Sequence, residues 1–161
     1  MLPHQSVEIL KKLDKKELKR FGEFLSSPYF NQSELINKIY DAVKKEYPDF
    51  NGKFLESEKM FKKLYPKEDF KATRIQNLYA EFGGLLRKFM GYEKIESKKS
   101  DLEIFIAKAL TKKDLNEISN KTILRTLNNY DDDGILNISN YFVNLHNLFL
   151  NYQHNMDSLS M

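Results

Sequence analysis

The three histidines are the residues whose side chains first suggest metal binding or acid–base chemistry. They are His4, His146 and His154, and no pair of them has the His-x-x-x-His spacing that places two ring nitrogens on one helix face. His146 and His154 also lie in residues 134–156, a stretch without one Asp, Glu, Lys or Arg. A metal site would need carboxylates among these residues, and this stretch supplies none, so we predict no metal and no cofactor.

A second motif with possible chemistry is the acidic run Asp131-Asp132-Asp133-Gly134. A calcium loop needs oxygen ligands at alternating positions and a closing Glu. The run has neither, since no acidic residue follows until Asp157. We interpret it as a loop between two helices.

Catalytic motifs of other kinds are missing from the sequence. The chain has no cysteine, which excludes thiol nucleophiles and thiolate metal sites. It has no Gly-x-Ser-x-Gly turn, and Gly83-Gly84 lacks the lysine and the spacing of a phosphate-binding loop. We therefore predict that the protein is not an enzyme.

Basic clusters in the first part of the chain suggest nucleic-acid binding as one possible function. Residues 11–20 hold six basic groups and two acidic ones. The candidates for phosphate contacts are Lys15, Lys16, Lys19, Arg20, Arg87 and Lys88, and the interleaved aromatic residues are Phe21, Tyr65, Tyr79 and Phe89. Against this, Lys outnumbers Arg 22 to 4, and Arg is the better bidentate ligand for phosphate and bases. A solvated lysine face is the simpler interpretation.

Two other groups of residues are candidates for binding a protein partner. The predicted helix 135–155 carries a column of amides that includes Asn140, Asn144, Asn147 and Asn151, opposite an apolar stripe formed by Ile138, Phe142, Leu145, Phe149 and Tyr152. The column is either a partner surface or an ordinary solvent face. Tyr29 and Phe30, in a Ser-Pro-Tyr-Phe-Asn turn, are either partner contacts or core residues that fold the loop back.

The elements that must position these residues are helices. Val occurs three times and Thr four times, whereas Leu and Lys, which favour helices, dominate. Asp14 with Glu17 forms a capping-box pattern, and Ile75, Leu78, Phe82, Leu85 and Phe89 follow steps of three and four. The predicted helices span about 6–13, 14–26, 33–47, 57–65, 75–91, 101–110, 114–129 and 135–155. This pattern predicts an all-α, multi-helix bundle of six to eight helices.

The composition changes after Gly91, a predicted helix stop. Residues 1–99 hold 21 basic and 15 acidic groups, whereas residues 100–161 hold 5 and 8. We predict a Lys-rich helical domain over 1–92, a polar hinge over 93–100 and an Asn-rich helical segment over 101–161 that packs on the first part or extends it.

The segment Leu13–Asn31, with its Glu-Leu-Lys-Arg-Phe and Ser-Pro-Tyr-Phe-Asn motifs, resembles the opening of an uncharacterised bacterial family of helical proteins. Phe61–Pro66 and Leu85–Phe89 fit the same family, and the resemblance covers about residues 7–90. It implies an all-helical fold and brings no known activity. Because members of that family are often longer, it also implies that the chain is either the N-terminal part of a longer helical array or a short member of the family. Residues 17–21 are similar, more faintly, to a helix of pyrin-type death-fold domains.

Taken together, these features favour a non-enzymatic protein-interaction or scaffolding module that binds a protein partner or a second copy of itself. The alternative is a helical nucleic-acid-binding domain that uses the basic N-terminal half. No run of about 18 apolar residues exists, so we predict no membrane span. The N-terminal residues lack the pattern of a secretory signal, and we expect a cytoplasmic protein.

Overall fold

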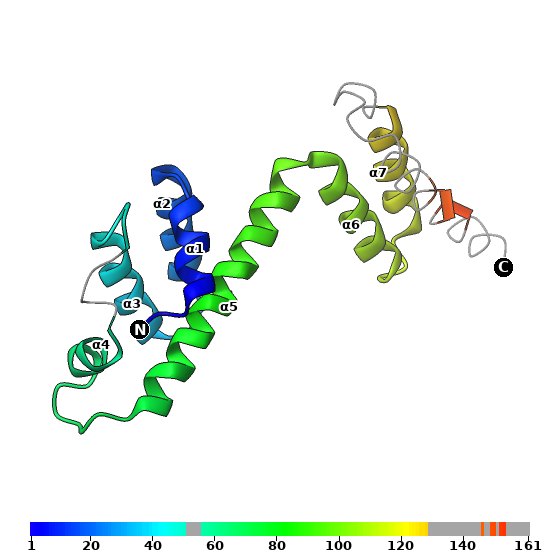
Figure 1. Ribbon diagram of the computed structural model, residues 1–161. Coiled ribbons are helices and arrows are strands. Elements are labelled where there is room, and N and C mark those ends of the chain that lie inside the picture. Colours follow the sequence, from blue (N-terminus) through cyan, green and yellow to red (C-terminus); the bar gives the residue numbers. More distant parts are fainter. Residues whose placement is uncertain (51–55, 129–145, 147–148, 151, 154–161) are drawn as a thin grey trace. The chain divides into compact units, whose positions relative to one another are not determined.

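The computed structural model describes residues 1–50, 56–128, 146, 149, 150, 152 and 153 (Figure 1). In this part of the chain the regular structure is seven helices and no strand, which confirms the all-α prediction. The helices are α1 (His4–Lys12), α2 (Lys15–Ser26), α3 (Glu34–Lys45), α4 (Ser57–Leu64), α5 (Ala72–Ser97), α6 (Lys99–Thr111) and α7 (Asn116–Asn128). Most of the predicted helix 135–155 lies outside the described residues.

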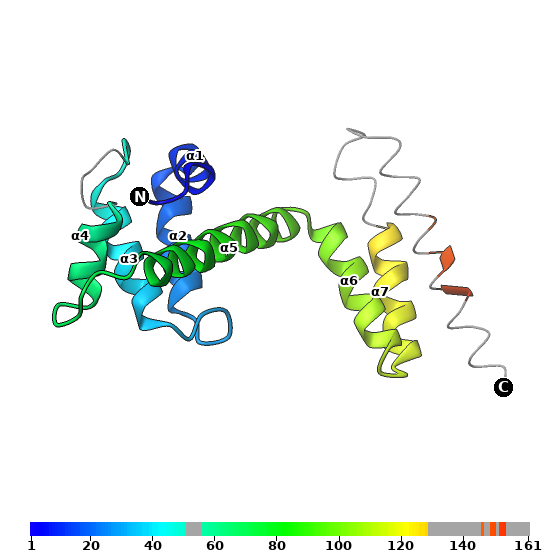
Figure 2. The same ribbon diagram turned by 60° about the horizontal axis from the view of Figure 1, so that its bottom comes forward.

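The chain divides into two compact units, Met1–Tyr92 and Glu93–Met161. The first unit gathers α1 to α4 along α5 (Figures 1 and 2). Its core is one cluster to which all five helices contribute. At the centre lies Phe21, whose ring centroid is 5.5 Å from that of Phe82 and 5.3 Å from that of Phe89. Large aromatic side chains therefore fill the space between α2 and α5.

Two glycines allow close approach within the first unit. A Cβ on Gly22 would collide with the ring of Tyr40, whose hydroxyl donates a hydrogen bond of 2.9 Å to the carbonyl oxygen of Leu18. A Cβ on Gly83 would lie 2.7 Å from the hydroxyl of Ser6. The glycines thus let α2 pack closely on α3, and α1 on α5.

The start of α2 is fixed by the predicted capping box. A carboxylate oxygen of Asp14 accepts hydrogen bonds from the backbone N–H groups of Lys16 and Glu17, at 2.7 and 2.8 Å. The carboxylate of Glu17 accepts one from the backbone N–H of Asp14 at 2.8 Å. The pKa of Asp14 is lower than its ordinary value, mainly because its carboxylate accepts the hydrogen bond from the backbone N–H of Glu17.

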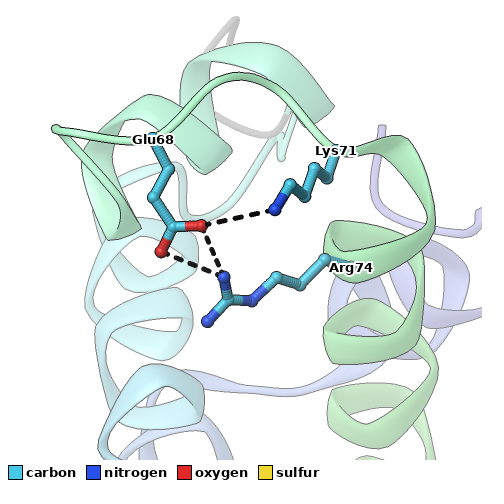
Figure 3. A network of polar contacts seen from close by, with 3 residues as sticks. All are labelled: Glu68, Lys71 and Arg74. Carbon is cyan, nitrogen blue, oxygen red and sulfur yellow. Dashed lines mark hydrogen bonds and ion pairs between the residues drawn. The ribbon is translucent and has the colours of Figure 1, made fainter.

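The connection from α4 to α5 is held by polar contacts (Figure 3). Both carboxylate oxygens of Glu68 accept hydrogen bonds from one guanidinium nitrogen of Arg74, at 3.0 and 2.7 Å. The ammonium nitrogen of Lys71 lies 4.0 Å from one of these carboxylate oxygens. The guanidinium carbon of Arg74 also stands 3.8 Å from the centroid of the Tyr65 ring. These contacts fix the loop on the surface, where ion pairs add little stability.

The predicted stop at Gly91 is wrong, because α5 continues to Ser97. A helical glycine costs only about 1 kcal/mol relative to alanine, and Glu93 and Lys94 beyond it are good helix formers. Helix α6 begins at Lys99, so most of residues 93–100 are helical. A hinge there stays a prediction.

Most of the described part of the second unit is the helix pair α6 and α7, which lie side by side (Figures 1 and 2). Its buried apolar cluster is small and consists of Ile104, Ala107 and Ile123. Ser119 is also buried, and its hydroxyl donates to the carbonyl oxygen of Ala107 at 3.0 Å. Small residues and satisfied hydroxyls at this interface let the two helices approach closely.

Candidate protein-interaction surface

The turn between α2 and α3 is fixed by backbone and side-chain hydrogen bonds. The backbone N–H groups of Phe30 and Asn31 both donate to the carbonyl oxygen of Ser27, at 3.1 and 3.0 Å. Because Pro28 follows Ser27, helix α2 stops here, and the chain closes a tight turn instead. The turn places Tyr29 at its apex.

The side chain of Asn31 fixes this turn through hydrogen bonds. Its side chain is buried, with a residue exposure of 7%, and its amide nitrogen lies 2.9 Å from the carbonyl oxygen of Leu25. The same nitrogen contacts the side-chain oxygen of Asn37 at 3.2 Å, and its own amide oxygen accepts from the backbone N–H of Ser33 at 2.9 Å. One buried amide therefore joins the end of α2 to the start of α3 and stiffens the loop.

Four aromatic rings and one lysine gather at this turn, and we call them the aromatic patch: Phe24, Tyr29, Phe30, Lys88 and Tyr92. The Phe30 ring stacks on Phe24 with a centroid distance of 4.2 Å and meets the Tyr92 ring edge-on at 4.9 Å. Tyr29 packs its ring against Phe30 at 5.0 Å and 89°. The ammonium of Lys88 lies 5.5 Å from the Phe30 centroid. Aromatic contacts of this kind stabilise the arrangement beyond simple burial.

The patch is anchored in the core and open to solvent. Phe24 lies 5.8 Å from the core ring of Phe89, whereas Tyr29 is 82% exposed and Tyr92 43% exposed. Phe30 is half-buried. The interpretation of Tyr29 as a core residue is therefore wrong, because its neighbour Phe30 takes the inner position and leaves Tyr29 outside.

The six basic candidates for nucleic-acid contacts are all exposed. Lys15 and Lys16 begin α2, whereas Lys88 lies beside the turn that follows the other end of this helix. A helix of twelve residues is about 18 Å long. Lys19 pairs with Glu23 at 3.5 Å. Arg20 belongs to α2, and Arg87 directly precedes Lys88 on α5. The structure does not gather all six into one cluster.

The aromatic residues predicted to interleave with these cations are mostly buried. Phe21 is 0% exposed, Tyr79 1% and Phe89 2%, and Tyr65 is half-buried beneath Arg74. Burial also raises the pKa of Tyr79 to about 12. The three buried rings cannot stack on bases, so this part of the nucleic-acid prediction is wrong.

The four asparagines of the predicted amide column lie outside the residues that the structure describes. They are Asn140, Asn144, Asn147 and Asn151. Of the opposing stripe, two residues are described: Phe149 is 56% exposed, and Tyr152 is half-buried. The neighbouring Leu150 is 48% exposed.

The sequence did not predict three contributors to the patch, which are Phe24, Tyr92 and Lys88 as a ring contact. Tyr92 follows Lys88 by four residues on α5, so the two lie on one helix face, which was visible in the sequence. Their approach to Phe30, about 60 residues earlier, was not visible.

No group of three potential metal ligands occurs in the described part of the chain, and none of its helices is long and apolar enough to cross a membrane. No protein-family model, curated protein or solved structure matches the sequence. The family resemblances above therefore stay predictions.

Proposed function

We propose that the protein is a non-enzymatic, cytoplasmic protein-interaction module and that the aromatic patch binds its partner. The observation that carries the proposal is the position of Tyr29, 82% exposed at the apex of a turn that the buried Asn31 holds. Tyrosine is among the residues that dominate binding energy at protein interfaces. A rigid loop binds with less loss of conformational entropy than a flexible one.

The chemistry of the patch suggests what the partner surface contains. Tyr29 projects as a knob with an apolar ring and a polar hydroxyl, so the partner supplies a pocket for an aromatic ring. Lys88 adds a positive charge beside that knob, and residues 1–92 hold 18 basic against 13 acidic groups. A carboxylate on the partner near Lys88 would complement the charge of Lys88 and the excess of basic groups in this unit.

The test begins with a photo-crosslinking amino acid at position 29 of the full chain, in cells that make the protein naturally. The same group at Phe70, another exposed aromatic residue of the first unit, serves as the control. A protein crosslinked at position 29 and absent at position 70 is then purified for binding measurements. Tyr29→Ala should weaken that binding at least about tenfold, and Phe70→Ala should leave it unchanged. Equal binding by both variants contradicts the proposal.

The nucleic-acid alternative has one observation in its favour. The Lys88 ammonium lies 5.5 Å from the centroid of the half-buried Phe30 ring, which packs against the exposed Tyr29, and single strands bind through stacking and positive charge. It predicts that a fluorescent oligothymidine binds the chain and that salt removes it steeply. Binding that Tyr29→Ala and Lys88→Ala both abolish would replace the protein-interaction proposal.

A further inference from the structure

The last part of α5 receives little support from the core. The buried residues of this helix end at Phe89, and none of residues 90–97 is buried. Gly91 lies near the start of this stretch. It is exposed, and no packing neighbour lies within 4 Å of the position that a Cβ would take. Close packing therefore does not explain why a glycine stands at this position.

The glycine makes the end of α5 sensitive to other contacts. Most helical stability in proteins comes from tertiary packing, so a helix that has left the core depends on the contacts that remain. At an exposed interior position, glycine makes the helical state about fivefold less favourable than alanine does. A gain or loss of one side-chain contact beyond Gly91 is therefore large enough to change how often residues 92–97 are helical.

Tyr92 makes such contacts directly after the glycine. Its ring centroid lies 4.9 Å from that of Phe30 and 5.8 Å from that of Phe24, and all three rings belong to the aromatic patch. Phe30 in turn stacks on Phe24 at 4.2 Å. Because Phe30 lies in the turn between α2 and α3, these contacts tie the end of α5 to a loop about 60 residues earlier. The patch and the helix end thus share one side chain.

We propose that the aromatic patch controls whether residues 92–97 are helical, with Tyr92 as the residue that couples the two. While Tyr92 packs on Phe30, α5 keeps its full length, and when this contact opens, the helix frays back to Gly91. The regulatory consequence rests on the proposed function: a partner on the patch would also cover Tyr92, which is 43% exposed, and so stabilise the helix end. The coupling is reciprocal, so a formed helix end favours partner binding.

The first test is hydrogen exchange of the full chain, resolved by peptide, in Phe30→Ala. This substitution leaves the sequence of α5 unchanged, so an effect there passes through the patch. Residues 92–97 should exchange at least about threefold faster than in wild type, while residues 75–89 keep their protection. Phe70→Ala, which truncates another exposed ring of the first unit, should leave residues 92–97 unchanged. Unaltered exchange of these residues in Phe30→Ala overturns the proposal.

Tyr92→Ala is a second test, and it does not depend on the stability of the turn. Alanine is a better helix former than tyrosine, so propensity alone predicts slower exchange of the amides that follow. The proposal predicts the opposite, at least about threefold faster exchange of residues 93–97, because the ring contacts are lost. Met90→Ala truncates a side chain that is 39% exposed just before the glycine, and this control should change little. Unchanged or slower exchange in Tyr92→Ala overturns the coupling.

A pair of glycine variants tests the role of Gly91. Gly91→Ala should slow the exchange of residues 92–97 about fivefold. Gly84→Ala is the matched control, because it also has no packing neighbour within 4 Å but lies where the core holds α5 on both sides. It should leave residues 92–97 unchanged. Equal effects of the two variants on these residues would contradict a special role of Gly91.

The link to the partner is tested with the photo-crosslinking group at position 29. Gly91→Pro breaks the helix and displaces Tyr92, so it should lower the crosslinking yield at least about threefold, with residues 75–86 still protected from exchange. Full yield in this variant overturns the reciprocal coupling. Absence of a crosslinked protein even in wild type contradicts the proposed function instead, while the exchange measurements decide separately whether the patch controls the end of α5.

Discussion

The two units of the chain bury their apolar residues in different ways. The first unit surrounds Phe21 with other rings, and the most exposed aromatic side chain among its described residues, Tyr29, lies at the turn between α2 and α3. The described pair α6 and α7 encloses one small apolar cluster and leaves larger side chains, Phe105 among them, exposed to solvent. Because burial of apolar surface is the main source of stability, the first unit has what it needs to fold alone. The described helix pair buries fewer apolar side chains than the first unit does.

The largest effect that would sharpen this comparison is expected from Phe21→Ala. Phe21 is fully buried between α2, α3 and α5, so its removal leaves a cavity and should lower the free energy of unfolding of the first unit by about 3–5 kcal/mol. Hydrogen exchange resolved by peptide would show lost protection in residues 1–92, while α7 keeps its own.

The matched change in the second unit is Ile123→Ala, which should cost about 2 kcal/mol, at the low end of such truncations, because a site between two helices can relax. Its effect should be confined to α6 and α7. If either variant destabilised both units equally, the division of the chain into two differently built parts would be wrong.

How far the sequence predicts this molecule depends on the range of the interaction. The capping box of Asp14 and Glu17 needs four consecutive residues, so its pattern was sufficient. The prediction that α5 ends at Gly91 was wrong, because the low helix propensity of one glycine is too weak to end a helix.

The candidate site was predictable only in part, for the same physical reason. Tyr29 and Phe30 were visible as aromatic residues after a helix stop, but which of them lies outside depends on Phe24 and Tyr92. The sequence position of Tyr92 is far from the turn, and periodicity does not show such contacts.

A smaller effect is expected from a pair of glycine substitutions within the first unit. The added methyl group of Gly22→Ala meets the Tyr40 ring, and the ring cannot move away without breaking its hydrogen bond to Leu18. We expect a loss of about 1–3 kcal/mol. Gly84→Ala places its methyl group where no other atom lies within 4 Å, so it should stabilise α5 by about 0.5–1 kcal/mol. Urea denaturation followed by circular dichroism measures both, and a loss in the Gly84 variant would contradict the described packing.

The smallest effect is expected at Asp14, and its sign follows from the capping box. Hydrogen bonding from the Glu17 amide lowers the pKa of the Asp14 carboxyl in the folded state. A carboxyl with a depressed pKa stabilises the fold above its unfolded pKa of about 3.9, and that contribution disappears as the pH falls through the folded pKa. Asp14→Ala should therefore unfold at lower urea than wild type at pH 7, and the difference should shrink in acid. Asp14→Asn keeps an oxygen that caps the helix but has no proton to gain, so its stability relative to Asp14→Ala should not depend on pH. A gap between wild type and Asp14→Ala that stays constant down to pH 2 would mean that the charge of Asp14 does not contribute, and that the cap acts through hydrogen bonding alone.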